Sequence, residues 1–425
     1  VELVKQARAQ VARLELSAAQ VAVLDGQAHT ARALWNLLHE YVTFRQGRLA
    51  TLKQCDDAIR AARREIDWLG QLPAQAAQAV LKTYRQAWAN FFNPEHPAER
   101  PTFKARFRSR PAVDVPQARD LQIKRINRRW GAVSLPKIGR VRFRWTKDLP
   151  GVTQGGPAGR ITGARLVKDA FGWQIVFRTE TMAAPVTVPH PGPAVGIDRG
   201  ITVALALSDQ TTREHGPWLS AGEKERLRRL EKKSARQRAT RATRTPGQPA
   251  SHRLGRTYGQ IARLRATAKR RAVDWQHRTT TELAATFGVV VVEDLKIANM
   301  VRSAKGTIER PGRNVRQKAG LNRSIAGEAW GRTVTLMEYK TRDRGGQVLK
   351  VPAPGTSQTC HRCGHRDPAS RDGTRFSCTN PACGWTGHAD TNAAINIHNA
   401  AGTAVSGRGD LGDTRSTKRQ PPHAA

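Results

Sequence analysis

The sequence predicts a multidomain protein of mixed α and β structure (α+β). Apolar residues recur with helical spacing between residues 21 and 94, and segments that alternate apolar and polar residues follow between 95 and 190. From about residue 191, strand patterns alternate with helix patterns, which is typical of an α/β layer fold. The 425 residues suffice for two to four domains and for a sizeable core without disulfide bridges.

Net charge is the most unusual feature of the composition. Lys and Arg total 72 against 34 Asp and Glu, which gives a formal charge of +38. A polyanion offsets the self-repulsion of such a chain, since basic side chains neutralise phosphates and release counterions. We therefore expect a nucleic acid partner, and a ribosome-bound or simply very basic protein is the alternative. No apolar run of about 18 residues and no signal-peptide pattern occurs, so we expect a cytoplasmic protein with no membrane partner.

The N-terminal quarter is predicted to be mostly helical after a short strand at 9–16. The first helix carries an apolar face at three- and four-residue steps, made of Leu24, Ala28, Ala31, Leu34, Leu38 and Tyr41. A second helix is expected at Ala74–Phe92, between Pro73 and Pro94. Its apolar face consists of Ala77, Leu81, Tyr84, Trp88, Phe91 and Phe92. We interpret the aromatic residues as core side chains rather than platforms for stacked bases.

Period-two segments then predict a small antiparallel barrel or sandwich. The expected strands are Leu121–Asn127, Ala132–Leu135, Gly139–Trp145, Arg160–Leu166 and Trp173–Phe177. Their solvent-facing positions are rich in Lys and Arg, which suits a nucleic acid backbone. Candidate contacts here are Lys124, Arg125 and Lys137, and a merely solvated basic face is the alternative.

The C-terminal half is predicted to contain strands at Val195–Ile197, Thr202–Leu207, Val289–Val292 and Gln347–Val351, with a helix near Ala326–Thr341. Between the second and third strands, residues 223–271 hold 17 Lys or Arg and three Glu, with a break at Pro246–Pro249. We expect an antiparallel helical pair at 220–285 that binds a duplex backbone; the alternative is a solvated charged face. The candidate contacts are Arg228, Arg229, Lys232, Lys233, Arg236, Arg263, Lys269 and Arg270.

Four of the five cysteines form two pairs. Two residues separate Cys360 from Cys363, four separate Cys378 from Cys383, and fourteen lie between the pairs. Two such pairs can present four thiolates tetrahedrally to a structural Zn²⁺. Disulfide bonds or an iron–sulfur cluster are the alternatives. The remaining cysteine, Cys55, is expected to be a structural thiol.

Three acidic residues occupy positions that suit metal-dependent chemistry. Asp198 ends the strand at 194–197, Glu293 ends the apolar run at 289–292, and Asp390 precedes a helix start. Carboxylates that converge at a sheet edge can bind two Mg²⁺ ions, which activate water for phosphodiester hydrolysis. Taken singly, the three acids could instead be a turn cap, half of a salt bridge and a helix N-cap. Asp294 is the rival of Glu293, and strand alternation admits only one of them to the site.

These segments resemble the motifs of a known family. Gly-Ile-Asp-Arg-Gly at 196–200, Val-Glu-Asp-Leu at 292–295 and His-Ala-Asp-Thr-Asn-Ala-Ala at 388–394 are similar to the three RuvC motifs of TnpB proteins. TnpB proteins are transposon-encoded nucleases related to compact type V CRISPR effectors. The cysteine pairs lie between the second and third motifs, as in that family, and weaker matches extend the resemblance from about residue 6 to 400. The second cysteine pair is wider than usual, and a more charged pair often replaces His388-Ala389.

The resemblance implies a division of the chain into domains. A wedge-like β-barrel, at 1–20 and 95–190, would be interrupted by a helical recognition lobe at 21–94. An RNase H-like (RuvC) α/β nuclease domain, at 191–355 and 387–401, would carry an inserted zinc ribbon at 356–386. Residues 402–425 are expected to form a disordered basic tail, because they are polar, Gly-rich and poor in apolar residues.

The resemblance also implies an RNA-guided DNA endonuclease. A guide RNA from the transposon end (omega RNA) would choose the target double-stranded DNA by pairing, next to a short flanking motif. The implied catalytic residues, which would bind two Mg²⁺ ions, are Asp198, Glu293 and Asp390. The implied Zn²⁺ ligands are Cys360, Cys363, Cys378 and Cys383. Alternatives are a compact type V CRISPR effector with a repeat-derived guide, an RNA-guided DNA-binding protein with weak cleavage, and a transposase that joins strands directly; the choice between monomer and dimer stays open.

Overall fold

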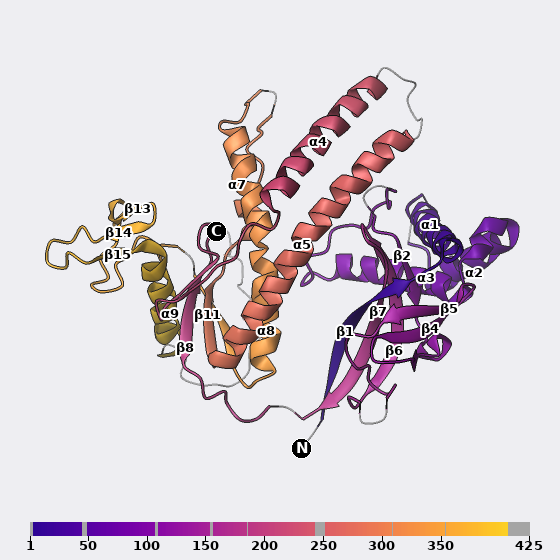
Figure 1. Cartoon of the computed structure of the whole chain (residues 1–425), viewed down its shortest axis with the longest axis horizontal. Helices are drawn as coiled ribbons and strands as arrows, with labels where there is room; N and C mark the ends of the chain where they lie inside the picture. The colour runs from indigo at the N-terminus through magenta and orange to yellow at the C-terminus, as the bar shows by residue number, and fades with distance from the viewer. Residues whose placement is uncertain are drawn as a thin grey trace, which may run out of the picture. The chain divides into compact units, whose positions relative to one another are not determined.

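The computed structural model describes residues 3–44, 49–106, 109–153, 156–184, 186–242, 251–307, 309–352 and 354–406 (Figure 1). The chain divides into two compact units. The first comprises Val1–Pro185 and Ala250–Ala266, and the second comprises Val186–Pro249 and Thr267–Ala425. In the part of the chain that the structure describes, no helix is both long and apolar enough to cross a membrane.

Among its described residues, the first unit consists of a seven-stranded antiparallel sheet, three complete α-helices and the N-terminal part of a fourth, up to Ala266. The strands are β1 (Val4–Glu15), β2 (Ala112–Val115), β3 (Lys124–Arg125), β4 (Trp130–Leu135), β5 (Gly139–Arg144), β6 (Arg160–Asp169) and β7 (Gly172–Ala183). The helices are α1 (Ala18–Thr43), α2 (Leu52–Glu65) and α3 (Ala74–Phe92), with short 3-10 helices at Asp67–Gln71 and Ala118–Leu121. One hydrophobic core joins the helices to the sheet, with Leu24, Leu34, Tyr84, Phe143 and Phe177 among its buried members.

The strand order of this sheet is β2-β6-β7-β1-β5-β4-β3. Strand β1 belongs to two neighbourhoods: residues 4–13 pair with β7, and residues 14–15 pair with β5. The antiparallel sheet expected from the sequence is therefore present. Strands β2 and β3 stand at the two ends of the order, and closure into a barrel stays a prediction.

Several sequence-based boundaries in this unit were wrong. The opening strand is longer than 9–16, because it pairs with β7 from Val4 onward. The strand expected at 121–127 is reduced to Lys124–Arg125, since Gln122 adopts a left-handed conformation (φ 39°) that interrupts the extended chain. Helix α2 was missed, although Thr51 and Gln54 form a capping box at its start.

The predicted helix Ala74–Phe92 is confirmed with those bounds, but its face is only partly core. Tyr84 and Trp88 are buried, as expected. Phe91 and Phe92 are 37% and 62% exposed, so their assignment to the core was wrong. Both lie in the last turn of α3, where they cluster with Trp88 at ring distances of 5.9 and 5.7 Å.

The second unit is built around a mixed five-stranded sheet. Its strands are β8 (Ala194–Asp198), β9 (Leu205–Leu207), β10 (Thr212–Arg213), β11 (Val289–Glu293) and β12 (Gln347–Val351), in the order β10-β9-β8-β11-β12. Its helices are α4 (Ala221–Ala242), α6 (Ile297–Met300), α7 (Val315–Glu328), α8 (Trp330–Arg342) and α9 (Ala389–Ser406). Helix α5 (His252–Thr286) contributes its C-terminal part, from Thr267. A separate small sheet contains β13 (Arg371–Asp372), β14 (Arg375–Ser377) and β15 (Thr386–His388), preceded by a 3-10 helix at Pro368–Ser370.

Helices cover both faces of the five-stranded sheet. Strands β8, β11 and β12 are parallel, and alternation along β11 sends its valines to opposite sides. Val290 and Val292 share a core cluster with side chains of α5 and α8, whereas Val291 shares one with Ile397 of α9. The backbone of α9 passes so close to β8 that a Cβ on Gly196 would lie 2.2 Å from the carbonyl oxygen of Ala394. Gly196 is thus required for the packing of α9 against the central strand.

The C-terminal predictions also need correction. The helix expected near 326–341 is two helices, α7 and α8, which meet at Ala329 in a left-handed conformation (φ 48°). The strand expected at 202–207 is limited to Leu205–Leu207. Helix α9 continues through residues 402–406, which the sequence assigned to the disordered tail. The rest of that tail, 407–425, and the Pro246–Pro249 break lie outside the described residues.

Candidate active site and cysteine cluster

Asp198 and Glu293 lie at the same edge of the five-stranded sheet. Strands β8 and β11 are parallel with Ile197 opposite Val292, so the next residue of each strand reaches the carboxyl edge together. Asp390 joins them from the first turn of α9 and is only 8% exposed. Three segments that are far apart in the sequence therefore bring these three acids together.

The pKa of Asp198 reports on this proximity. Burial raises it, and the negative charges of Glu293 and Asp390 raise it further, to about 7. The guanidinium of Arg371 opposes that shift. In the isolated chain, the negative charge of an acid that is buried beside two other acids is poorly compensated. Such a negatively charged environment is typical of a cation-binding site.

Strand alternation separates Glu293 from its rival Asp294. The carboxylate of Glu293 accepts a hydrogen bond from the hydroxyl of Thr356. Asp294 is exposed and forms an ion pair at 2.5 Å with Lys296, which lowers its pKa. Glu293, and not Asp294, is therefore the neighbouring acid whose negative charge raises the pKa of Asp198.

Two arginines that the sequence did not single out as site residues lie at the carboxylates. Arg371, from β13, donates from Nη2 to Asp390 Oδ1 at 2.9 Å. Arg199 is 6% exposed and donates from Nη2 to the carbonyl oxygen of Glu293, while its Nε is buried without a hydrogen-bond partner among the described residues. Arg199 was visible as part of the 196–200 motif. Arg371 carries no local signal, because only the fold of the small sheet brings it to Asp390.

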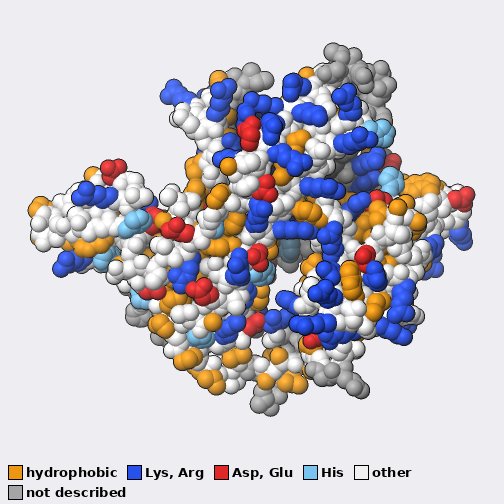
Figure 2. Space-filling model, in the orientation of Figure 1, with side chains coloured by type: hydrophobic (Ala, Val, Ile, Leu, Met, Phe, Trp, Pro, Cys, Tyr) orange, Lys and Arg blue, Asp and Glu red, His pale blue; other side chains and the backbone are white. Residues whose placement is uncertain are grey.

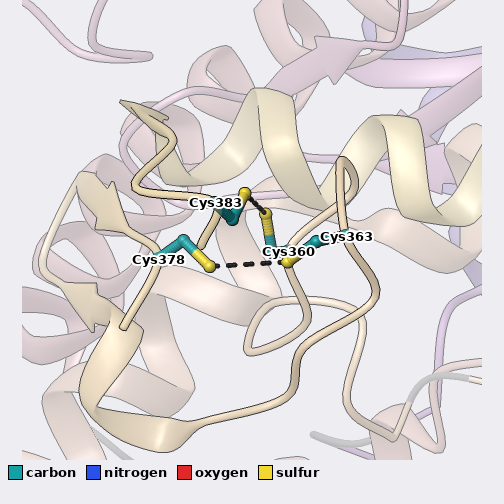
Figure 3. A group of neighbouring side chains, drawn as sticks. All are labelled: Cys360, Cys363, Cys378 and Cys383. Carbon is teal, nitrogen blue, oxygen red and sulfur yellow. Dashed lines mark hydrogen bonds between the residues drawn. The ribbon is translucent and has the colours of Figure 1, made fainter. Parts of the chain in front are cut away.

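The four paired cysteines form one compact cluster (Figure 3). Their sulfur atoms all lie within 4.8 Å of one another. Contacts of 3.9 Å between Cys360 and Cys383 and of 3.6 Å between Cys363 and Cys378 link the two pairs. The backbone N–H of His365 is the main cause that lowers the pKa of Cys363 to about 7. None of the five cysteines, all of which the structure describes, forms a disulfide bond, so the disulfide alternative is wrong.

Helix α9 ties this cluster to the carboxylates. Asn392 is fully buried, accepts from the backbone N–H of His361 at 3.0 Å and donates to the carbonyl oxygen of Thr359 at 2.7 Å. Asn396 donates to the carbonyl oxygens of Thr356 and Thr359 at 2.9 and 2.6 Å. The helix that begins beside Asp390 thus fixes the chain segment that enters the cysteine cluster.

The two sets of candidate ligands differ in compactness. Of the His, Cys, Asp and Glu residues that the structure describes, only the four cysteines form a group of three or more that is compact enough to hold a metal ion as it stands. The three carboxylates interact electrostatically but do not form such a group. Arg371 lies among them, where its positive charge interacts with Asp198 and Asp390.

All eleven predicted nucleic-acid contacts are exposed. Figure 2 shows Lys and Arg side chains along α4 and over the seven-stranded sheet on the visible face. Some are already paired within the protein: Arg125 lies 3.3 Å from Asp148, Lys137 donates to the carbonyl oxygen of Gly70 at 2.6 Å, and Arg228 pairs with Glu225 at 2.7 Å. Exposure keeps these residues available to a polyanion, and their role stays a prediction.

Comparison with known proteins places the chain in a family. A family model described as "Cas12f1-like, TNB domain" matches residues 330–397, and one described as "Probable transposase" (OrfB_IS605) matches residues 175–304. The candidate RNA-guided DNA endonuclease InsQ of Escherichia coli (strain K12) is 34% identical over 361 residues, which cover 84% of this chain and 82% of InsQ. The chain belongs to the TnpB family. The family predicted from the motifs is thereby confirmed.

A more distant relative and a CRISPR effector structure also match. A candidate RNA-guided DNA endonuclease of Streptomyces pristinaespiralis is 28% identical over 353 residues, covering 81% of this chain and 76% of the relative. A solved complex of Cas12f1 with guide RNA and target DNA is similar in structure, with a TM-score of 0.44 and 13% identity over 94% of this chain and 99% of the other.

Proposed function

We propose that this TnpB-family chain is an RNA-guided DNA endonuclease that hydrolyses phosphodiester bonds at Asp198, Glu293 and Asp390. The observation that carries the proposal is the convergence of these acids at the carboxyl edge of β8 and β11, under the first turn of α9. InsQ is named as an RNA-guided DNA endonuclease, and it aligns with most of this chain. That similarity supports the same activity for this protein.

We assign the five-stranded sheet with α5, α8 and α9 to the RNase H-like (RuvC) domain that the motifs imply. Its central parallel strands and the helices on both faces suit that assignment. The seven-stranded sheet of the first unit is assigned to the wedge-like barrel, and α1–α3 to the recognition lobe. Residues 360–383 with β13–β15 are assigned to the ribbon.

The carboxylate site fits divalent cations by the chemistry of its donors. Three carboxylates supply the all-oxygen ligands that Mg²⁺ prefers. Burial and the negative charges of Glu293 and Asp390 raise the pKa of Asp198, and a bound cation would offset the repulsion among the three acids. When bound, two Mg²⁺ ions would activate the attacking water and stabilise the leaving oxygen. In this chain Thr356 orients Glu293, and Arg371 orients Asp390.

The cysteine cluster fits a structural Zn²⁺. Four sulfur atoms within 4.8 Å of one another can close a tetrahedral site. Such a closed site leaves no position for a substrate, so the role we assign to the cluster is to hold β13–β15. That sheet includes Arg371, and the cluster would therefore support Asp390 indirectly.

The exposed basic residues are assigned to binding the guide RNA and the target duplex. RNA binding and DNA binding both rest on phosphate contacts, which suit a chain with a net charge of +38. Sequence choice would then lie in base pairing rather than in protein contacts to the bases. We propose that the protein binds its guide RNA and cuts DNA in the cytoplasm of a prokaryotic cell.

The proposal can be tested by expressing the chain together with its native flanking DNA and sequencing the nucleic acid that copurifies. A single discrete RNA with a variable end segment is expected. Heterogeneous cellular RNA, or none, would contradict guidance and favour the transposase. An RNA that matches a repeat array would instead identify a type V CRISPR effector, and a discrete RNA without cutting would identify a DNA-binding protein.

A further inference from the structure

A pocket of ≈ 450 Å³ opens in the first unit where strand β1 changes partner. At Arg13 the strand still faces Gln174 of β7, and at Leu14 it faces Phe143 of β5. The two neighbours diverge there and leave a hollow, which we call the fork pocket. Its lining includes Arg13, Glu15, Trp130, Arg144, Lys168 and Trp173. A volume of this size lies within the range of about 300–1,000 Å³ that is typical of small-molecule sites.

The aromatic walls of the fork pocket are held in fixed positions. Trp173 is 2% exposed, and its indole N–H donates to Asp25 at 3.1 Å. Lys168 also donates to the Asp25 carboxylate, at 2.7 Å to each oxygen. Trp130 is half-buried and lies under two guanidinium groups of β5, those of Arg142 and Arg144, at 5.1 and 4.6 Å. Walls that are fixed in advance lower the ordering cost of binding a planar ligand.

Two arginines at the fork pocket, Arg13 and Arg144, have no carboxylate as an ion-pair partner among the described residues. Glu15 pairs with Arg142 at 2.7 Å, and Asp25 pairs with Lys168. Among the described residues, Arg13 and Arg144 form no ion pair; Arg13 donates only to the carbonyl oxygen of Phe171, at 3.3 Å. Both side chains are exposed at the pocket rim. An apolar, aromatic interior with unneutralised guanidinium groups at its rim matches a base attached to a phosphate.

We propose that the fork pocket binds one unpaired nucleotide of the guide RNA, with its base against Trp130 and its phosphate at Arg13 and Arg144. The inference rests on the proposed function, because that function supplies the RNA. RNA is the favoured source since its loops, bulges and ends present unstacked bases before any target is bound, whereas a DNA duplex keeps its bases stacked until the guide opens it. A pocket for a single base also differs in role from the basic outer face of the sheet. That face would contact the phosphate backbone of any nucleotide sequence.

Photocrosslinking tests where the nucleotide lies. The copurifying RNA is transcribed with 4-thiouridine, bound to the full chain without DNA, irradiated and digested. We expect nucleotide adducts on the peptides that contain Trp130 or Phe171–Trp173. Adducts here from target DNA labelled with 4-thiothymidine, without adducts from the labelled RNA, would show that the occupant is DNA and would contradict the proposal, as would RNA adducts confined to other parts of the sheet.

Two pairs of variants separate specific binding from general charge. Arg144→Ala and Arg140→Ala each remove one exposed guanidinium from β5, but only Arg144 lines the pocket. We expect Arg144→Ala to weaken RNA binding about 5–50-fold and Arg140→Ala to weaken it about 2-fold or less. Trp130→Ala should weaken binding about 5–100-fold, and Trp130→Phe, which keeps an aromatic face, should recover most of that loss.

The outcome also separates this inference from the proposed function. If the parent chain cuts guide-matched DNA while Arg144→Ala and Arg140→Ala bind RNA equally well, the fork pocket is not a nucleotide site and the nuclease assignment stands. If the parent chain binds no discrete RNA, both fail. Thermal unfolding of every variant checks that a loss of binding does not reflect a loss of folding.

Discussion

The cysteine cluster and the carboxylate cluster lie in the same unit but are assembled in different ways. The cysteines come from one segment of 24 residues, between Cys360 and Cys383, and their sulfurs gather within 4.8 Å. The acids come from positions 198, 293 and 390 and meet only because two parallel strands and α9 are in place. A local site depends on spacing alone, whereas a distributed site depends on the fold and on neighbours that no motif contains.

The largest expected effect tests whether Glu293 or Asp294 belongs to the carboxylate cluster. Glu293→Gln should reduce cutting of guide-matched DNA by about 10³-fold or more, because it removes a ligand used in the chemical step. RNA and DNA binding should stay within about 3-fold. The matched control is Asp294→Asn, which neutralises the adjacent exposed acid and should leave cutting near the parent rate. If Asp294→Asn were the inactive variant, the alternation argument would be wrong.

The next effect tests the local site. Cys360→Ser removes a fully buried thiol of the cluster, so we expect the zinc content of the purified protein to fall below one ion per chain. Zn²⁺ in such sites contributes about 10–16 kcal/mol of binding free energy in isolated peptides, so the ribbon should lose protection against proteolysis. Cys55→Ala, which removes the buried thiol outside the cluster, is the control and should keep its zinc. Equal zinc content in both variants would contradict the assignment.

A smaller effect tests the link between the two sites. Arg371→Ala removes the guanidinium that orients Asp390, and we expect cutting to fall about 10–100-fold with unchanged RNA binding. Arg371→Lys should recover part of the loss because the positive charge is kept. Arg375→Ala removes an exposed arginine from the neighbouring strand β14 and is the control. If Arg371→Ala cuts like the parent, the contact to Asp390 has no role in the reaction.

The smallest expected effect is on stability. The folded-state pKa of Asp198 is raised to about 7 from 3.8, so the stability that its bound proton provides is present below pH 3.8 and is lost as the pH rises through 7. In magnesium-free buffer, Asp198→Asn should therefore be more stable than the parent above pH 7, by roughly 1–4 kcal/mol. The advantage should shrink toward pH 4 in thermal or urea unfolding. A constant difference across this range would show that the carboxyl does not titrate there.

The sequence predicted the parts of the molecule that depend on short-range pattern. Cysteine spacing identified a cluster that the fold then closed, and apolar runs located β8, β11 and β12. Strand alternation admits only one of Glu293 and Asp294 to the site without choosing between them. In the structure, Glu293 is the one whose negative charge raises the pKa of Asp198. The three acids were named from their positions at strand and helix ends, and their roles in catalysis remain proposals.

What the sequence missed depends on tertiary contacts or on unusual backbone conformations. Arg371 reaches Asp390 only through the fold of β13. The break at Ala329 and the short β3 follow from left-handed residues that are neither Gly nor Asn. The exposure of Phe91 and Phe92 reflects what covers the last turn of α3, which helical periodicity cannot report.

The most direct test of the account is to change the variable segment of the copurifying RNA and to measure where matched plasmid DNA is cut. The parent chain should cut the new target in the presence of Mg²⁺ and leave the old target intact. The Asp198→Ala variant should still bind the RNA and the matched DNA, but it should cut neither the new nor the old target. A cut site that does not follow the RNA would contradict guidance. Cutting by Asp198→Ala at the parent rate would contradict the assignment of the site.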